Sequence, residues 1–279
     1  MIPVAFEYER ATTADQALAL LAEHGDEAKL IAGGHSLLPL MKLRLATPAV
    51  LVDIARLADL SYIRVDGDEV AIGALTRHCD LETSEVLAAE VPLLAHAAGQ
   101  VGDPQVRHRG TLGGSIVHGD PASDLPAVLL ALGGTVVVTG PSGERRIPAA
   151  DVFVGFLETA VGEDELLTEV RVPRVPGVGW SFQKFTQRAG DWAIVGVAAL
   201  AGGASAPVGP GVALVNMGAT PLRATAVEAA LLGGADAAEA ASLAAEGTEA
   251  PADLHASPDF REHLARVLVR RALQEAAAR

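Results

Sequence analysis

AGGHS, residues 32–36, is the first of two stretches that decide the fold, and TLGGS, residues 111–115, is the second. Each joins two glycines to a hydroxyl side chain, and the first directly follows a short apolar run typical of a buried strand. Glycine tolerates a positive φ and has no Cβ, so successive backbone N–H groups can converge on an anion, and the hydroxyl adds one donor. Two such loops predict a site for the two phosphates of one dinucleotide, although ordinary tight turns have the same composition.

The other common phosphate-binding motifs are absent from the sequence. The nearest approach to G-x-G-x-x-G starts at Gly177 and Gly179 and has Phe182 in place of the last glycine. None of the three lysines follows a glycine and precedes Ser or Thr, as a P-loop requires. A bound phosphate is therefore not held in the manner of a Rossmann fold or a P-loop.

Strand and helix patterns alternate around the two stretches. Thr13 and Gln16 form a capping box, and Asp66-Gly67 is the turn of a hairpin. The predicted strands cover residues 29–32, 50–54, 63–72 as a hairpin, 135–139, 166–172, 180–187, 193–200 and 212–217. The predicted helices cover residues 14–24, 37–45, 80–89, 92–101 and 258–278. The glycine-rich segment 102–124 has little periodicity and reads as a long, ordered functional loop.

The segment from Pro173 to Gly179 resembles a linker, so we place a domain boundary near Arg174. The first domain is predicted over residues 1–174, in two parts of about 1–55 and 56–174. The second domain is predicted over residues 175–279, with a three-stranded sheet and helices. The mixture of strand and helix patterns predicts an α+β fold.

Composition limits what the chain can bind. It has 279 residues, 50% of them hydrophobic, and a formal net charge of −14. An acidic surface with only 4% aromatic residues excludes nucleic acid as a bulk partner. A single cysteine, Cys79, excludes a disulfide framework, a cysteine-ligated zinc site and an iron–sulfur cluster held by this chain alone.

The sequence shows no pattern of a membrane span or of a secretory signal. No stretch reaches about 18 uninterrupted apolar residues, and the first residues lack a charged region followed by an apolar run. We therefore expect a cytoplasmic chain that does not span a membrane.

Hydrolase and metal chemistry find no support in the residue pattern. None of Ser36, Ser115 and Ser123 stands in a G-x-S-x-G turn, and no histidine can be paired with them. Four candidate metal ligands lie among glycines and prolines that define no common face: His108, His118, Asp120 and Asp124. We predict no metal site and no catalytic acid, base or nucleophile in this chain.

Several cations and one aromatic residue allow two interpretations. Lys184 shares a strand face with Trp180 and Phe182, so its ammonium lies among apolar neighbours, either facing a ligand or extending back to water. Trp192 is most simply a core residue. Arg107, Arg109 and His35 either supply positive charge and donors to a phosphate or are ordinary exposed side chains.

Four motifs together carry a resemblance to a known family. AGGHS at 32–36, TLGGS at 111–115, HGDPASDLPA at 118–127 and QKFTQRAGDWA at 183–193 resemble the FAD-binding medium subunit of molybdenum hydroxylases. This is the family of xanthine oxidase and carbon monoxide dehydrogenase. The opening, FEYERATTADQALALLAEHGDEAKLIAGGHSLLPLMKLRLATP, is most similar to the medium subunit of the carbon monoxide dehydrogenase type. The motifs follow the order of the family over nearly the whole chain.

The resemblance implies a set of FAD-binding residues. Asp124 is expected to hydrogen-bond ribityl or ribose hydroxyls, Leu166 to lie against the flavin ring, and Lys184 to lie near the pyrimidine end of the isoalloxazine. Trp192 matches an aromatic residue that often follows Gly-Asp in the family. The residues expected to hold the pyrophosphate, chiefly through backbone donors, are Ile31, Ala32, Gly33, Gly34, His35, Ser36, Leu37, Thr111, Gly113, Gly114 and Ser115.

The resemblance also implies a fold and a role. The fold is the two-part, PCMH-type FAD-binding domain of the vanillyl-alcohol oxidase group, followed by the small C-terminal domain. The role is electron transfer, from 2Fe-2S clusters of a small partner subunit to an external acceptor, within a complex whose large subunit carries the molybdenum cofactor. A dimer of heterotrimers is expected, either free in the cytoplasm or held at the inner face of the membrane.

One alternative belongs to a different class of flavoprotein. A self-sufficient flavin oxidase or dehydrogenase of the vanillyl-alcohol oxidase group would bind its substrate over the flavin ring. Such an enzyme usually has a longer cap domain, and the part of the chain after Arg174 leaves little room for one.

Overall fold

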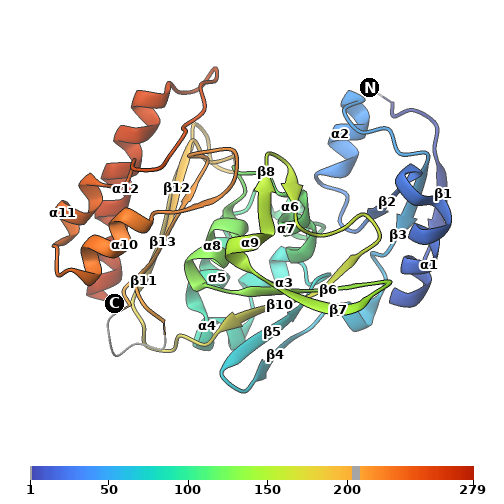
Figure 1. The fold of residues 1–279 in the computed structure, drawn as a ribbon, viewed down its shortest axis with the longest axis horizontal. Coiled ribbons are helices and arrows are strands. Elements are labelled where there is room, and N and C mark those ends of the chain that lie inside the picture. Colours follow the sequence, from blue (N-terminus) through green and yellow to red (C-terminus); the bar gives the residue numbers. More distant parts are fainter. Residues whose placement is uncertain (1, 203–207) are drawn as a thin grey trace.

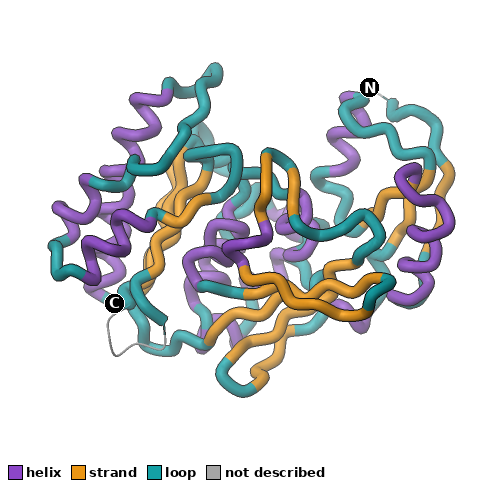
Figure 2. Tube along the Cα trace, viewed as in Figure 1, coloured by secondary structure: helices purple, strands orange, loops and turns teal. Residues whose placement is uncertain are grey.

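The chain folds around three separate sheets of three, five and four strands, with a short two-stranded hairpin beside the second (Figures 1 and 2). The computed structural model describes residues 2–202 and 208–279. Helices cover the sheets, so the architecture is α+β, as expected. No helix in the described part of the chain is both long and apolar enough to cross a membrane.

The N-terminal sheet is parallel, in the order β1-β3-β2. Helix α1 begins at the predicted capping box, where the Thr13 hydroxyl accepts the backbone N–H of Gln16 at 3.1 Å. It buries Ala17, Leu20 and Leu21 against the sheet. The elements of this part are β1 (Glu7–Arg10), α1 (Ala14–His24), η1 (Gly25–Glu27), β2 (Ala28–Ile31), α2 (Leu37–Leu43), β3 (Val50–Asp53) and η2 (Ala58–Leu60).

The central sheet is antiparallel, in the order β4-β5-β10-β6-β7. The predicted hairpin turn at Asp66-Gly67 is confirmed by the pairing of β4 with β5. Strand β7 was not predicted, because its sequence, GERRIP, is charged and mostly exposed, with only Ile147 buried. The strands are β4 (Ile63–Asp66), β5 (Glu69–Gly73), β6 (Thr135–Gly140), β7 (Gly143–Pro148) and β10 (Leu166–Pro173).

Short helices pack on the central sheet and on one another, and one hairpin packs against two of these helices (Figure 1). The predicted helix 80–89 is wrong as one unit, because Ser84 starts a new helix by accepting the N–H of Leu87. The elements are α3 (His78–Glu82), α4 (Glu85–Glu90), α5 (Pro92–Ala98), α6 (Pro104–Arg107), α7 (Leu112–His118), α8 (Asp124–Leu132), α9 (Ala149–Val152), β8 (Phe153–Gly155) and β9 (Glu158–Thr159). The predicted loop 102–124 therefore contains two helices, α6 and α7.

The C-terminal sheet is antiparallel, in the order β11-β12-β13-β14, and has helices on both faces. Strand β12 is apolar throughout because Ala198 and Leu200 face α8 and the central core while Val195 and Val197 face α12. The predicted three strands gain a two-residue fourth, β14. The elements are β11 (Trp180–Phe185), β12 (Val195–Leu200), β13 (Gly211–Val215), β14 (Leu222–Arg223), α10 (Thr225–Leu232), α11 (Ala237–Ser242) and α12 (Pro258–Ala278).

Candidate functional site

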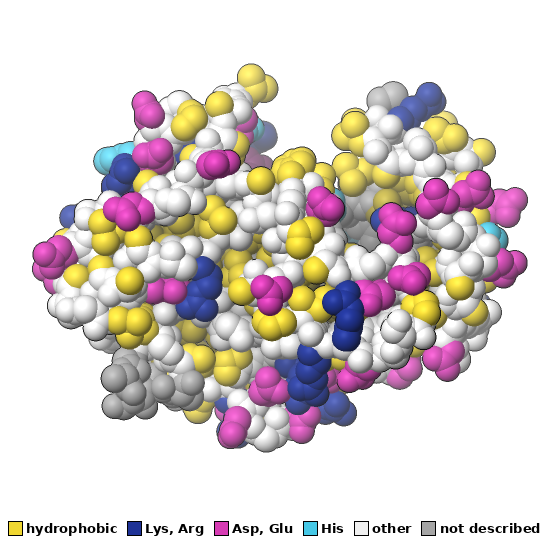
Figure 3. Space-filling model, viewed as in Figure 1, with side chains coloured by type: hydrophobic (Ala, Val, Ile, Leu, Met, Phe, Trp, Pro, Cys, Tyr) yellow, Lys and Arg dark blue, Asp and Glu magenta, His cyan; other side chains and the backbone are white. Residues whose placement is uncertain are grey.

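A cavity of about 550 Å³ joins all three parts of the chain. Its lining comes from the end of β2 and start of α2, from the central helices around α7 and α8, and from β11 with the loop that follows it. In Figure 3 the surface is hollowed between the N-terminal part, which carries α2, and the centre, which carries β8. The cavity has the size usual for a ligand site.

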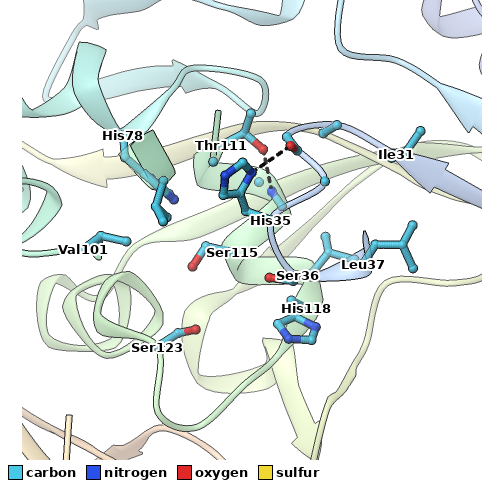
Figure 4. A pocket seen from close by; sticks show the side chains of 18 of the residues that line it. Ile31, His35, Ser36, Leu37, His78, Val101, Thr111, Ser115, His118 and Ser123 are labelled. Carbon is cyan, nitrogen blue, oxygen red and sulfur yellow. Dashed lines mark hydrogen bonds between the residues drawn. The ribbon is translucent and has the colours of Figure 1, made fainter. Parts of the chain in front are cut away.

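The structure brings all of the predicted site residues to this one cavity. They are Ile31, Ala32, Gly33, Gly34, His35, Ser36, Leu37, Thr111, Gly113, Gly114, Ser115, Asp124, Leu166, Lys184 and Trp192. Figure 4 shows His35, Ser36, Ser115 and Ser123 around the same space, although they come from two parts of the sequence. The role of each residue toward a ligand remains a prediction.

The AGGHS motif is a true loop between β2 and α2. Gly34 has φ = +75°, the left-handed region that favours glycine. Among the hydrogen bonds of residues 2–202 and 208–279, none uses the backbone N–H groups of Gly34, His35, Ser36 or Leu37. The internal contact of the loop uses a backbone carbonyl instead, because Nδ1 of His35 lies 3.1 Å from the carbonyl oxygen of Gly33 (Figure 4). The loop therefore presents a row of unused donors beside the cavity.

The TLGGS motif is not a loop but the first turn of helix α7, which corrects the expectation from composition. Its N-cap is Thr111, whose hydroxyl accepts the N–H of Gly114 at 3.2 Å. The N–H of Gly113 donates to the carbonyl of Ala74 at 2.8 Å, and that of Ser115 to Thr111. The amides from Leu112 to Ser115 are thus used within the protein, and the Ser115 hydroxyl remains for a ligand.

The AGGHS loop contacts the two residues that lead into the TLGGS motif, Arg109 and Gly110, through their backbone. A Cβ on Gly33 would overlap the carbonyl oxygen of Arg109 and lie 3.0 Å from the Cα of Gly110. Gly33 is therefore required by this close approach and not by a positive φ, which among the motif glycines only Gly34 has. Gly113 meets a similar limit, since its Cβ would lie 2.7 Å from that of Ala74. The contact fixes the distance between the two motifs.

Asp124 and Lys184 form a buried ion pair that links the central domain to β11. The ammonium of Lys184 lies 2.7 Å from Oδ2 of Asp124 and 3.0 Å from the carbonyl oxygen of Gln100. The two side chains are 6% and 5% exposed. The expectation that the Lys184 ammonium lies only among apolar groups is therefore wrong, because the carboxylate neutralises it.

The free oxygen of Asp124 points to a missing partner. Oδ1 is buried and forms no hydrogen bond within the described residues. Burial raises the pKa of Asp124 to about 6, and the neighbouring Lys184 ammonium opposes this rise. Burying a carboxylate oxygen without a hydrogen-bond donor costs stability. This atom is therefore suited to accept a hydrogen bond from a hydroxyl group of a bound molecule.

The remaining predicted residues give the cavity an apolar side. Leu166, at the start of β10, is 2% exposed and lines the cavity with Val101. Trp192 also lines it but is 59% exposed, so the interpretation of Trp192 as a core residue is wrong. A lining that combines apolar and aromatic side chains with free amides suits a ligand that has a ring system and an anionic portion.

The arginines of the segment 102–124 serve the fold. Arg107 forms an ion pair with Glu82 at 2.8 Å and also donates to the carbonyls of Val101 and Gly102. Arg109 contributes its carbonyl to the contact with Gly33. In the described part of the chain, no group of three or more histidine, cysteine, aspartate or glutamate side chains is placed to hold a metal ion.

Sequence reasoning missed several lining residues. His78 and Val101 lie on this cavity, at the start of α3 and just beyond α5, in segments whose patterns are those of ordinary helices. His118 and Ser123 also line it, and both lie in the motif at 118–127, from which only Asp124 was assigned to the site. Residues such as these become visible only when the segment 74–78 is known to run beside 110–113.

The sequence matches two family descriptions that together cover most of the chain. Residues 4–175 match the FAD binding domain in molybdopterin dehydrogenase, and residues 180–276 match the CO dehydrogenase flavoprotein C-terminal domain. The free amides of the AGGHS loop, the unpartnered Asp124 oxygen and the apolar side chains of the lining fit the pyrophosphate, ribityl hydroxyls and ring of FAD.

Individual proteins agree with the family match. The chain is 43% identical to the carbon monoxide dehydrogenase medium chain of Hydrogenophaga pseudoflava, over 100% of this chain and 99% of the relative. It is 39% identical to the 6-hydroxypseudooxynicotine dehydrogenase complex subunit alpha of Paenarthrobacter nicotinovorans, covering 100% and 97%. A solved carbon monoxide dehydrogenase from Hydrogenophaga pseudoflava superposes with a TM-score of 0.95 at 44% identity, covering 100% and 99%. The chain therefore belongs to the FAD-binding medium subunits of the molybdenum hydroxylases, with FAD as its cofactor.

Proposed function

We propose that this chain receives electrons from a 2Fe-2S partner subunit and passes them to an external acceptor through its FAD. The observation that carries the proposal is the cavity itself, which assembles a dinucleotide site from three parts of the chain. No group of the chain has been assigned as acid, base or nucleophile toward a substrate. The single cysteine means that the clusters must belong to another chain.

Each part of the cavity has a proposed task in holding the cofactor. The amides of Gly34 to Leu37 bind the pyrophosphate, and the hydroxyls of Ser36 and Ser115 add donors. Oδ1 of Asp124 accepts a ribityl hydroxyl, while Leu166 and Trp192 flank the ring. When bound, FAD supplies a centre that takes up electrons and releases them to the acceptor.

Lys184 has a positioning task in this proposal. Its ammonium holds Oδ2 of Asp124, which leaves Oδ1 without a partner in the protein and available to the ligand. It also donates to the carbonyl of Gln100, beside Val101 on the apolar wall. One side chain of the C-terminal domain thereby orients two groups of the central domain.

The partners are proposed from the names of the relatives. A medium chain and a complex subunit imply further chains, and we propose a 2Fe-2S small subunit and a molybdenum-cofactor large subunit in a dimer of heterotrimers. Two relatives of similar identity are named for different substrates, carbon monoxide and 6-hydroxypseudooxynicotine. This supports assigning substrate choice to a chain other than this one.

The test is purification of the native complex from the source organism. We expect co-purifying chains that mass spectrometry identifies as iron–sulfur and molybdenum subunits, and FAD in the supernatant after acid precipitation. Reduction of the flavin should require the partner chains. Flavin reduction by alcohols or aldehydes in this chain alone would instead favour the self-sufficient oxidase, and a complex without flavin would contradict both.

A further inference from the structure

His78 lies on the cavity wall without a task in the function proposed above. The strip from Ala74 to His78 runs antiparallel to the start of the TLGGS motif, with Leu112 donating to Thr76 at 3.0 Å and His78 donating to Gly110 at 3.1 Å. These backbone bonds place the His78 side chain directly behind Gly110. Figure 4 shows it on the side of the cavity that also carries Val101 and Thr111.

The imidazole packs so closely against Gly110 that only glycine fits at position 110. A Cβ on Gly110 would lie 2.6 Å from Cδ2 and 2.8 Å from Nε2 of His78. On its other side, the Cα of Gly110 meets Gly33 of the AGGHS loop. His78 therefore lies beside the point where the AGGHS loop contacts the chain just before the TLGGS motif.

The ring is buried and its polarity is not satisfied by the protein. His78 is 4% exposed, and its Nδ1 has no hydrogen-bond partner among the described residues. Burial, together with the positive charges of Arg107 and His35, lowers the pKa of His78 to about 4. The ring is neutral at physiological pH, so it has one N–H to donate.

We propose that His78 donates a hydrogen bond from its imidazole to a phosphate oxygen of the bound FAD. The proposal rests on the proposed FAD-binding function and adds a residue to it. A phosphate fits better than a hydroxyl because the free amides of the AGGHS loop, which suit an anion, follow Gly33, and Gly33 contacts Gly110 beside the ring. The second motif has used its own amides within the protein, so the imidazole supplies a donor there.

The experiment measures FAD and ADP binding to the complex after its flavin has been removed. His78→Phe keeps a ring to pack against Gly110 and removes both nitrogens, whereas His78→Gln keeps an amide that can donate. We expect His78→Phe to weaken both FAD and ADP binding by about tenfold or more, as loss of one hydrogen bond to a charged group implies. His78→Gln should recover part of that loss.

The outcomes separate this inference from the function beneath it. A wild-type complex that binds no FAD would contradict the proposed function, whatever His78 does. Wild-type affinity in His78→Phe would overturn the hydrogen bond alone. Weaker binding of FAD with unchanged binding of ADP would move the contact to the ribityl or ring part and overturn the assignment to phosphate. If His78→Phe does not assemble, a structure of the wild-type complex with FAD decides, since a ring nitrogen more than about 3.5 Å from every phosphate oxygen overturns the proposal.

Discussion

The motifs AGGHS and TLGGS have nearly the same composition and opposite structures. In the first, the chain forms a loop whose amides from Gly34 to Leu37 have no partner within the described residues. In the second, the amides of Gly113 and Gly114 are bound by Ala74 and Thr111. Composition therefore indicated the chemistry of the ligand, but it did not distinguish a motif with free amides from a motif whose amides are used within the protein.

The difference follows from what lies next to each motif. The strip 74–78 runs beside the second motif and accepts its N–H groups, so that motif is held by the central domain. The first motif leaves its sheet at Ile31 and has no such neighbour except at Gly33. We expect substitutions in the first motif to act on the ligand and those in the second to act on stability.

The largest effect on FAD affinity is expected at Gly33, where the first motif contacts the chain just before the second. Gly33→Ala places a Cβ against the carbonyl oxygen of Arg109, which is backbone and cannot rotate away. The motifs must separate, so we expect FAD affinity to fall by more than about 100-fold, a loss of roughly 3 kcal/mol. Flavin content of the purified complex and titration with FAD measure this. Full flavin occupancy in Gly33→Ala would show that the loop is free to move.

The ion pair of Asp124 and Lys184 extends the comparison, because one carboxylate oxygen is used internally and the other is not. Lys184→Met leaves Asp124 buried without its cation, and breaking a buried pair in this way costs about 3 kcal/mol. Asp124→Asn combined with Lys184→Met should recover a large part of that loss. Denaturant unfolding of the four proteins gives the coupling energy. Additive effects of the two substitutions would contradict the pairing.

The sequence predicted the residues of the site more completely than the elements of the fold around it. All fifteen residues of the predicted set line the cavity, most of them because they lie in or beside a motif of unusual composition, whereas Leu166 was predicted from the family resemblance alone. Sequence reasoning missed β7 and the strip 74–78 because charged or short segments with few apolar residues carry no periodic signal. It also placed Lys184 on the correct strand but could not foresee Asp124, since that contact spans two domains.

Low pH should lower the stability of the protein around the second motif, because it protonates the buried His78. Its pKa is about 4 in the folded protein and 6.5 in its ordinary state, so the unfolded chain binds more protons between these values. The contribution of neutral His78 to the free energy of unfolding is therefore complete above pH 6.5 and decreases as the pH falls toward 4. At pH 5 it has decreased by about 2 kcal/mol. We expect His78→Gln to show a smaller loss of melting temperature between pH 8 and pH 5. Identical pH profiles would place the imidazole in contact with water.

The smallest effect is expected at Gly114, the counterpart of Gly33 in the second motif. A Cβ there meets only the hydroxyl of Thr111, at 2.8 Å, and this side chain can rotate. Rotation removes the N-cap hydrogen bond of α7, which costs about 1 kcal/mol. Gly114→Ala should therefore lower the melting temperature of the complex by a few degrees while changing FAD affinity less than about threefold. Because the N–H of Gly114 already donates within the protein, a large loss of FAD binding in Gly114→Ala would mean that the cofactor takes this amide from Thr111. The second motif would then open when FAD binds, and the division between a binding motif and a supporting motif would hold only for the chain without its cofactor.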